Sequence, residues 1–250
     1  MIYIIVVFII GLLYIYYRLF SPNKLIVLMY HQIEEESNGD LCVSRKNLED
    51  QLKYLSERKW ETLFFKDLNN HHKEKKVIIT FDDGYKNNEE YLPPLLKKYN
   101  LKATIFIPTR FIEEGYEDYR MMTFAEIKNL DSQRIEIGLH SHSHCNFKEQ
   151  TLAFLEEDLK KNMEVLEANN ITYTKALAYP YGKFPRKKED KQTFFNMLDR
   201  LGITYAVRIG NKINKTPLKS RYELCRVDVK GNDSLLKFKL KLIFGKLKLF

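Results

Sequence analysis

The feature of this sequence that most constrains its fold is the repeated alternation of short apolar runs with longer helical patterns. Seven runs rich in β-forming residues follow residue 24, at 25–30, 77–81, 103–107, 135–138, 176–179, 205–207 and 224–227. Short, continuously apolar runs are typical of strands that are buried in a parallel sheet. Segments with apolar residues three or four apart separate most of them, which predicts βα units with right-handed crossovers. About seven strands in roughly 225 residues favour a closed or nearly closed α/β barrel over an open sheet.

Local signals within this pattern predict some details. Thr123 and Glu126 have the spacing of a capping box, which begins a short helix. Pro93 and Pro94 are expected to delay or kink the helix that follows the run at 77–81. The polar stretch 69–76 is expected to be a surface loop.

The first seventeen residues contain no charged side chain. As a helix they would span roughly 25 Å, close to the thickness of a bilayer core. A cleaved signal peptide would begin with basic residues and end in small ones, and this segment does neither. We therefore expect a transmembrane anchor at residues 1–20 and a single folded domain at 24–250. Arg18 and Lys24 follow the segment, and by the positive-inside rule these two charges favour a cytoplasmic domain only slightly.

Composition excludes several classes of protein. With 44% hydrophobic and 30% charged residues, wholesale disorder is not expected. Three cysteines without a C-x-x-C pair exclude a disulfide scaffold. The net charge of +8 and the tail KFKLKLIFGKLKLF would suit nucleic acid or a lipid surface. A packed last helix explains the tail as well, and we expect no nucleic-acid partner.

Three motifs directly follow predicted strands, where barrel folds place their working residues. The first is TFDDGY at 80–85, in which Asp82 and Asp83 are adjacent. One carboxylate could bind a metal while the other handles a proton, although a plain Asp-Gly turn is the alternative.

The second motif is HSHSH at 140–144. If the segment turns helically, His140 and His144 share a face and can bind one ion, whereas His142 points elsewhere. With one carboxylate, two histidines would make three ligands and leave a fourth position open, as in catalytic zinc sites.

The third motif is YPYG at 179–182. Its aromatic rings could line a sugar-binding pocket, and a backbone N–H there could bind an oxyanion. Taken alone, the motif is a weak signal, because the sequence Pro-Tyr-Gly is also common in turns.

In this order, and after LMYHQI at 28–33, these motifs resemble the polysaccharide deacetylase family, the NodB-homology carbohydrate esterases. The residue patterns MYH and YPYG are most similar to the motifs of the subgroup that acts on poly-N-acetylglucosamine. The resemblance extends from Lys24 to about Asp228. It implies a distorted (β/α) barrel and metal-dependent N-deacetylation of an acetylated amino sugar.

The resemblance also implies a role for each matching residue. Asp82 would be the catalytic base, and Asp83, His140 and His144 would bind Zn²⁺ or another divalent transition metal. The backbone N–H of Tyr181 would help to hold the oxyanion. Ser141 would brace the loop between the two histidines.

The sequence departs from the family pattern at three places. Ala178 replaces the arginine that orients the catalytic base, no histidine follows His144, and Trp60 is the only tryptophan. The general acid is therefore unassigned, and His31 is the nearest substitute, with a structural role equally open. A catalytically impaired sugar-binding protein is the alternative function. Because the family works on envelope polymers, we expect a single-pass membrane protein with an extracytoplasmic domain.

Overall fold

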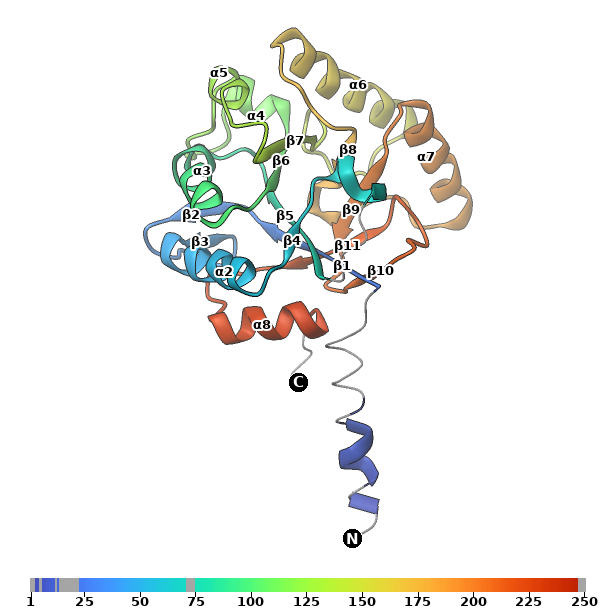
Figure 1. Ribbon diagram of the computed structural model, residues 1–250. Coiled ribbons are helices and arrows are strands. Elements are labelled where there is room, and N and C mark those ends of the chain that lie inside the picture. Colours follow the sequence, from blue (N-terminus) through green and yellow to red (C-terminus); the bar gives the residue numbers. More distant parts are fainter. Residues whose placement is uncertain (1–2, 5, 12, 14–22, 71–74, 247–250) are drawn as a thin grey trace.

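The computed structural model describes residues 3–4, 6–11, 13, 23–70 and 75–246. Within these residues, parallel strands close into a barrel (Figure 1). Its strands, in order around the barrel, are β1 (Lys24–Tyr30), β5 (Lys75–Asp82), β6 (Ala103–Ile107), β7 (Ile135–Leu139), β8 (Ala176–Ala178), β9 (Tyr205–Ile209) and β11 (Leu224–Asp228). Closure comes from β1, which pairs in parallel with both β5 and β11. The predicted barrel and all seven of its strands are confirmed.

The barrel is uneven around its circumference. β1 and β5 pair over their whole common length, whereas β7 and β8 share only the pair Leu139 and Leu177. Four short strands were not predicted: β2 (Gln32–Glu34), β3 (Cys42–Ser44), β4 (Glu61–Thr62) and β10 (Asn214–Lys215). They have two or three residues each and several are polar, so no hydrophobic period marks them.

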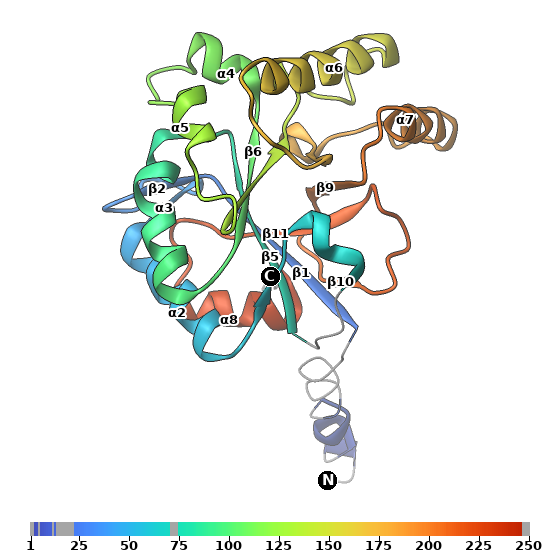
Figure 2. The same ribbon diagram turned by 45° about the horizontal axis from the view of Figure 1, so that its top comes forward.

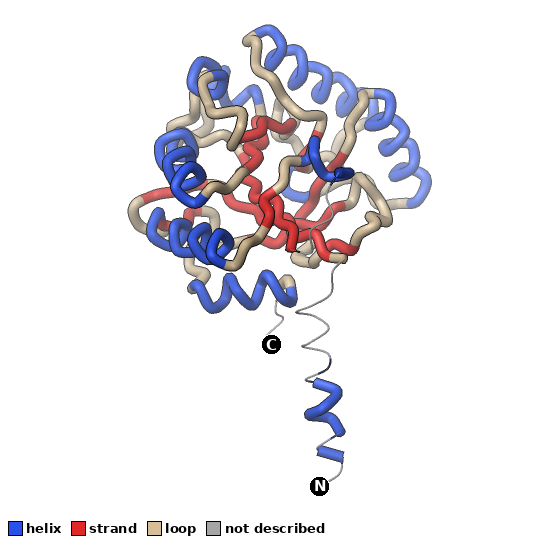
Figure 3. The backbone as a smooth tube through the Cα atoms, viewed as in Figure 1, coloured by secondary structure: helices blue, strands red, loops and turns tan. Residues whose placement is uncertain are grey.

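Helices surround the strands, as Figures 2 and 3 show. They are α2 (Arg45–Glu57), α3 (Lys86–Tyr99), α4 (Thr109–Glu114), α5 (Phe124–Lys128), α6 (Leu152–Ala168), α7 (Lys188–Arg200) and α8 (Leu235–Phe244). The domain also contains two 3₁₀ turns, η1 (Phe65–Asn70) and η2 (Pro180–Gly182). The predicted capping box of Thr123 and Glu126 begins α5.

Two local predictions were wrong in part. Pro93 and Pro94 do not delay their helix, because α3 begins at Lys86 and continues past both to Tyr99. The expected loop at 69–76 does not hold at its ends, since residues 69–70 end η1 and Lys75 and Lys76 begin β5, and 71–74 lie outside the described residues. Both lysines belong to the strand because Lys75 pairs with Lys24 and Lys76 pairs with Leu25 of β1.

Alternation along the strands produces two apolar clusters. Ile26 and Leu28 belong to the larger cluster, together with residues of the surrounding helices. Leu25, Val27 and Ile78 belong to a smaller one with residues of β6, β8, β9 and β11. Since side chains two apart share a face of a strand, this second cluster fills the barrel interior.

The predicted anchor at residues 1–20 lies mostly outside the described residues. In the part of the chain that the structure describes, no helix is both long and apolar enough to cross a membrane. Residues 3–4, 6–11 and 13 are helical.

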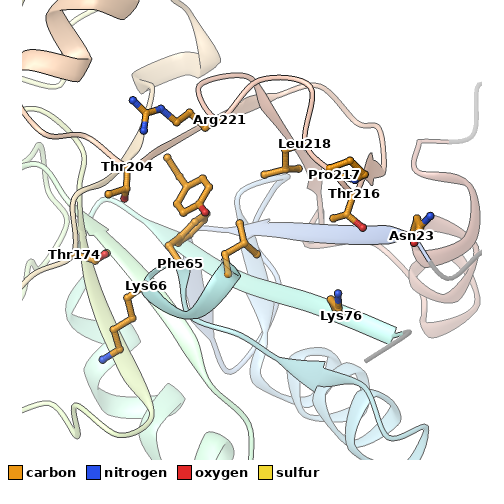
Figure 4. A pocket seen from close by; sticks show the side chains of 12 residues that line it. Asn23, Phe65, Lys66, Lys76, Thr174, Thr204, Thr216, Pro217, Leu218 and Arg221 are labelled. Carbon is orange, nitrogen blue, oxygen red and sulfur yellow. The ribbon is translucent and has the colours of Figure 1, made fainter. Parts of the chain in front are cut away.

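A cavity of about 830 Å³ opens at the amino ends of the barrel strands (Figure 4). Its lining includes Thr174 and Thr204, which precede β8 and β9, and Lys76 near the start of β5. None of the three predicted motifs contributes to it. The cavity therefore lies at the end of the barrel opposite the motif residues.

Candidate active site

The carboxyl ends of β5, β7 and β8 bring the three predicted motifs together. Asp82 is the last residue of β5, His140 follows β7, and Tyr179 follows β8. Parallel strands end at the same rim of a barrel, so these residues meet although they are about 100 positions apart in the sequence. The structure accordingly brings the three motifs together at one rim of the barrel.

The adjacent carboxylates are separated by a change of backbone conformation. Asp82 is in the strand, whereas Asp83 has a φ of 75°. This left-handed conformation is uncommon for a residue other than glycine, and it turns the chain sharply at the strand end. Both side chains consequently reach His140, whose Nε2 lies 3.8 Å from Asp82 Oδ2 and 3.5 Å from Asp83 Oδ1.

The two outer histidines of HSHSH meet, but not by a helical turn. Their segment is irregular, and positive φ values at Ser141 (64°) and His144 (54°) fold it back. Ser141 Oγ accepts a hydrogen bond of 2.9 Å from the His144 amide. The Asp158 carboxylate on α6 accepts two more from the loop, from the amides of His142 and Ser143. The loop is thus held by side chains instead of by a helix.

His142 points away from the other two, as the sequence predicts. Its Nδ1 lies 2.9 Å from Thr109 Oγ1 and 3.8 Å from Glu113 Oε2. His140, by contrast, donates from Nδ1 to the Ala178 carbonyl oxygen at 2.8 Å. Because a carbonyl only accepts, that hydrogen bond leaves the lone pair of His140 on Nε2, which faces Asp83.

Asp83, His140 and His144 form a cluster that fits a metal ion. One ligand atom from each lies within 4.8 Å of the others. Asp83 Oδ1 is 3.3 Å from His144 Nε2, and it is buried with no hydrogen-bond partner among the described residues. A buried carboxylate oxygen costs free energy when it is unpaired, and a cation that accepts it together with two imidazole lone pairs removes that cost.

The charged groups of this cluster shift one another's pKa values. Burial raises the pKa of Asp83, but the neighbouring histidines outweigh it and hold that pKa far below its usual range. Burial and the charge of His140 lower the pKa of His144 to about 4. Burial lowers the pKa of His140 as well, yet the charges of Asp82 and Asp83 outweigh it and raise that pKa.

Asp82 is held by an arginine that the sequence analysis missed. Arg226 lies on β11 and is 1% exposed, and its Nη1 and Nη2 donate to Asp82 Oδ1 and Oδ2 at 2.6 and 2.7 Å. Arg226 Nη1 also donates to Thr80 Oγ1 at 3.3 Å. Burial raises the pKa of Asp82, but the charges of Arg226 and His140 more than offset this, so that the pKa is lowered. Asp82 is therefore an oriented, ionised carboxylate.

His31 also reaches this carboxylate. It follows β1, its side chain is 14% exposed, and its Nε2 lies 3.8 Å from Asp82 Oδ2. The side chain of Asn88 on α3 donates to the His31 backbone carbonyl at 2.8 Å. His31 is thus a second imidazole beside Asp82 Oδ2, at the same 3.8 Å distance as His140 Nε2.

Tyr181 lies beside the cluster in η2. The residue is 57% exposed, and the centroid of its ring is 4.9 Å from that of the His144 ring. Tyr181 has a φ of 56°, which turns the backbone between Pro180 and Gly182. Gly182 has no room for a side chain, because a Cβ there would lie 2.7 Å from the Ile209 amide nitrogen. The YPYG motif therefore packs tightly on β9 and presents Tyr181 towards the histidines.

Comparison with known proteins gives a consistent result. Residues 69–206 match the family model described as polysaccharide deacetylase. The Bacillus subtilis protein YxkH is 31% identical over 170 residues, a match that covers 66% of this chain and 59% of YxkH. The poly-beta-1,6-N-acetyl-D-glucosamine N-deacetylase of Staphylococcus aureus is 27% identical over 227 residues, 85% of this chain and 76% of that protein.

A solved structure has the same fold. The Streptococcus pyogenes deacetylase PplD, in complex with acetate, superposes with a TM-score of 0.76 at 23% identity, over 89% of this chain and 99% of that one. The family model ends before Arg226 and begins after His31, so these two site residues lie outside the matched range.

Proposed function

Because this chain belongs to the polysaccharide deacetylase family, we propose that it removes N-acetyl groups from an acetylated amino-sugar polymer or glycoconjugate of the cell envelope by metal-dependent hydrolysis. The observation that carries the proposal is the juxtaposition of the Asp83, His140 and His144 cluster with the paired carboxylate of Asp82. The staphylococcal relative makes an N-acetylglucosamine polymer the first substrate to test.

The ligand cluster suggests the kind of metal. Two imidazole nitrogens and one carboxylate oxygen suit borderline divalent ions, and Zn²⁺ is our first candidate. When bound, such an ion would polarise the acetamide carbonyl and make a water molecule more acidic. Asp83, His140 and His144 would hold it.

Asp82 is the proposed general base. It is ionised, and both of its oxygens are fixed by Arg226, so its orientation does not depend on the substrate. It would take the proton of the attacking water, and the Tyr181 backbone N–H would donate to the oxyanion of the tetrahedral intermediate.

His31 is the proposed general acid. Its Nε2 lies 3.8 Å from Asp82 Oδ2, at the same rim of the barrel as the ligand cluster. A protonated His31 could give its proton to the departing amine, a role that no histidine after His144 is available to fill.

Arg226 bears on the alternative function, a catalytically impaired sugar-binding protein. One argument for impairment was the loss of an arginine at position 178, yet Asp82 has a bidentate arginine partner from another strand. That argument no longer favours the alternative.

The direct test is acetate release by the purified protein from a panel of N-acetylglucosamine polymers and glycolipids, with and without a chelator. We expect release that the chelator abolishes and that Zn²⁺ restores, and we expect Asp82→Asn to be inactive. Binding of these substrates without acetate release, at full metal occupancy, would favour the alternative function.

We further propose that residues 1–20 anchor the chain in a membrane and that the domain at 24–250 lies on the extracytoplasmic side. The uncharged apolar stretch supports the anchor, and the described part of it carries exposed apolar side chains such as Tyr3 and Val7. Release by detergent but not by high salt is the expected result for the anchor. A fusion reporter after Phe250 that is active only in the cytoplasm would contradict the proposed side.

A further inference from the structure

The middle histidine of the HSHSH motif has no part in the proposed chemistry, yet it is fixed at three points. Its backbone amide donates to Asp158 Oδ2 at 3.1 Å, and its backbone carbonyl accepts a hydrogen bond of 3.0 Å from the Arg110 amide. Its ring Nδ1 lies 2.9 Å from Thr109 Oγ1. His142 therefore connects the loop to the first residues of α4 and to the middle of α6, two helices that lie side by side in Figure 2.

The Asp158 carboxylate is shared between two consecutive amides of this loop. Its Oδ1 accepts from the Ser143 amide at 2.9 Å, while its Oδ2 accepts from the His142 amide. A carboxylate accepts hydrogen bonds more strongly than a neutral group does, and Asp158 is only 6% exposed, so water competes little with the two amides. Because both acceptor atoms belong to one rigid group, they fix the direction of the chain between the two ligand histidines.

The groups that hold the loop are themselves held from behind. Asn162 is one turn after Asp158 on α6 and is fully buried, and its Nδ2 donates to Thr109 Oγ1 and to the Ile107 carbonyl, both at 3.1 Å. Thr109 is fully buried as well. Ile107 ends β6, the neighbour of β7, and His140 follows β7. These hydrogen bonds therefore tie α6 to the barrel close to the first metal ligand of the loop.

The two ligand histidines differ in what fixes them. His140 directly follows a barrel strand, so the barrel places its backbone, whereas His144 lies at the far end of the irregular segment. The φ of 54° at His144 is a conformation that a residue other than glycine keeps only where the neighbouring structure enforces it. Asp158 and Thr109 fasten the part of the loop between the two histidines, and His144 takes its position from that part.

We infer that Asp158 is a positioning residue for the metal site, which sets the course of the ligand loop and thereby the affinity for the metal, although its carboxylate bonds only to loop amides. Thr109 has the same role through the His142 ring. If the loop is ordered beforehand, less of the binding free energy is lost in ordering it when a metal binds. This inference rests on the proposed metal-dependent function and adds to it residues outside the ligand cluster.

The first test measures the zinc affinity of the full chain in detergent, before and after the substitution Asp158→Asn. Asparagine has the shape of aspartate but carries a donor NH₂ in place of one oxygen, so one of the two loop amides loses its acceptor. We expect the dissociation constant for zinc to rise by about 10- to 100-fold. Glu157→Gln is the matched control, since it removes the same charge from an exposed neighbour on α6 and should change the affinity less than about twofold.

Hydrogen exchange of the metal-free proteins gives a second readout that needs neither zinc nor activity. The segment 141–145 should exchange faster in Asp158→Asn than in the parent protein or in Glu157→Gln, because a loop amide has lost its fixed acceptor. Denaturant titration of the metal-free proteins shows that the variants are folded. Thr109→Val removes only the hydroxyl beside the His142 ring, and it should shift zinc affinity and exchange in the same direction if Asp158→Asn does not fold.

Equal zinc affinity in the folded Asp158→Asn and Glu157→Gln proteins would overturn the inference. Unchanged exchange of the segment 141–145 would overturn it too, because the course of the loop would then not depend on Asp158. If the parent protein binds no zinc while the segment exchanges faster in Asp158→Asn, the proposed metal-dependent function fails and the role of Asp158 in ordering the loop stands.

Discussion

Replacing Arg226 by methionine tests whether this arginine holds the catalytic carboxylate. Methionine fits the volume of the arginine stem but removes both hydrogen bonds to Asp82, which is 2% exposed. Breaking a buried ion pair from one side costs about 3–5 kcal/mol, because the remaining charge stays buried without the hydrogen bonds that compensated its burial. We expect a loss of unfolding free energy of that size near neutral pH, measured by denaturant titration in detergent.

The loss should depend on pH in a definite direction. In the parent protein the pKa of Asp82 is lowered, so its ion pair stabilises the fold above the pKa of the unfolded chain. That stabilisation disappears as the pH falls through the folded pKa. Without Arg226, burial dominates and the pKa of Asp82 rises, so the difference between the two proteins should shrink towards acid pH. The acid limb of the kcat profile should move to higher pH in the variant.

Two further variants make this prediction specific. Asp82→Asn combined with Arg226→Met should be more stable than Arg226→Met alone, because no charge remains unpaired. Arg200→Met removes an exposed ion pair with Glu156 and should cost less than about 1 kcal/mol. If Arg226→Met loses no more stability than Arg200→Met, the pairing does not hold Asp82 as we argue.

Three other predictions concern the metal. His140→Ala or His144→Ala should abolish stoichiometric zinc while the fold is retained, and full zinc by mass spectrometry in the double variant would refute the ligand assignment. Asp82→Asn should keep zinc and lose turnover by orders of magnitude, whereas Asp83→Asn should weaken zinc binding itself; identical metal content and rate in both would show that the two roles are not divided. Zinc affinity should fall as the pH falls, because the pKa of His140 is raised and a proton on that ring competes with the metal. The pKa of His144 is about 4, so protonation of His144 should compete with the metal only in more acidic solution. Titration of zinc binding between pH 5 and 8 measures this, and an affinity independent of pH there would contradict it.

The barrel could be predicted because hydrophobic periodicity is strongest in buried parallel strands. Each predicted run became a strand within about two residues, and the carboxyl-end rule then placed Asp82 and His140 together. The short strands and the course of the histidine loop could not be predicted, since positive φ at Ser141 is set by tertiary contacts such as those from Asp158. Periodicity carries no information about such a turn.

Arg226 was missed although the sequence contains a signal for it. It is the only charged residue in the apolar run LCRV, and a charge in a buried strand must have a partner. Which partner it takes depends on the order of strands around the barrel. Strand order is not visible in a single sequence, and here it brings β11 and β5 to either side of β1.

That arrangement has a consequence for how the protein becomes active during synthesis. The proposed acid, His31, follows the first barrel strand, whereas the arginine that orients the proposed base is on the last one. A ribosome releases these segments in that order, so an emerging chain can already contain every proposed metal ligand and still lack Arg226. We therefore expect a nascent or prematurely terminated chain that ends before β11 to be catalytically silent. Activity would begin only when the final strand docks beside the first.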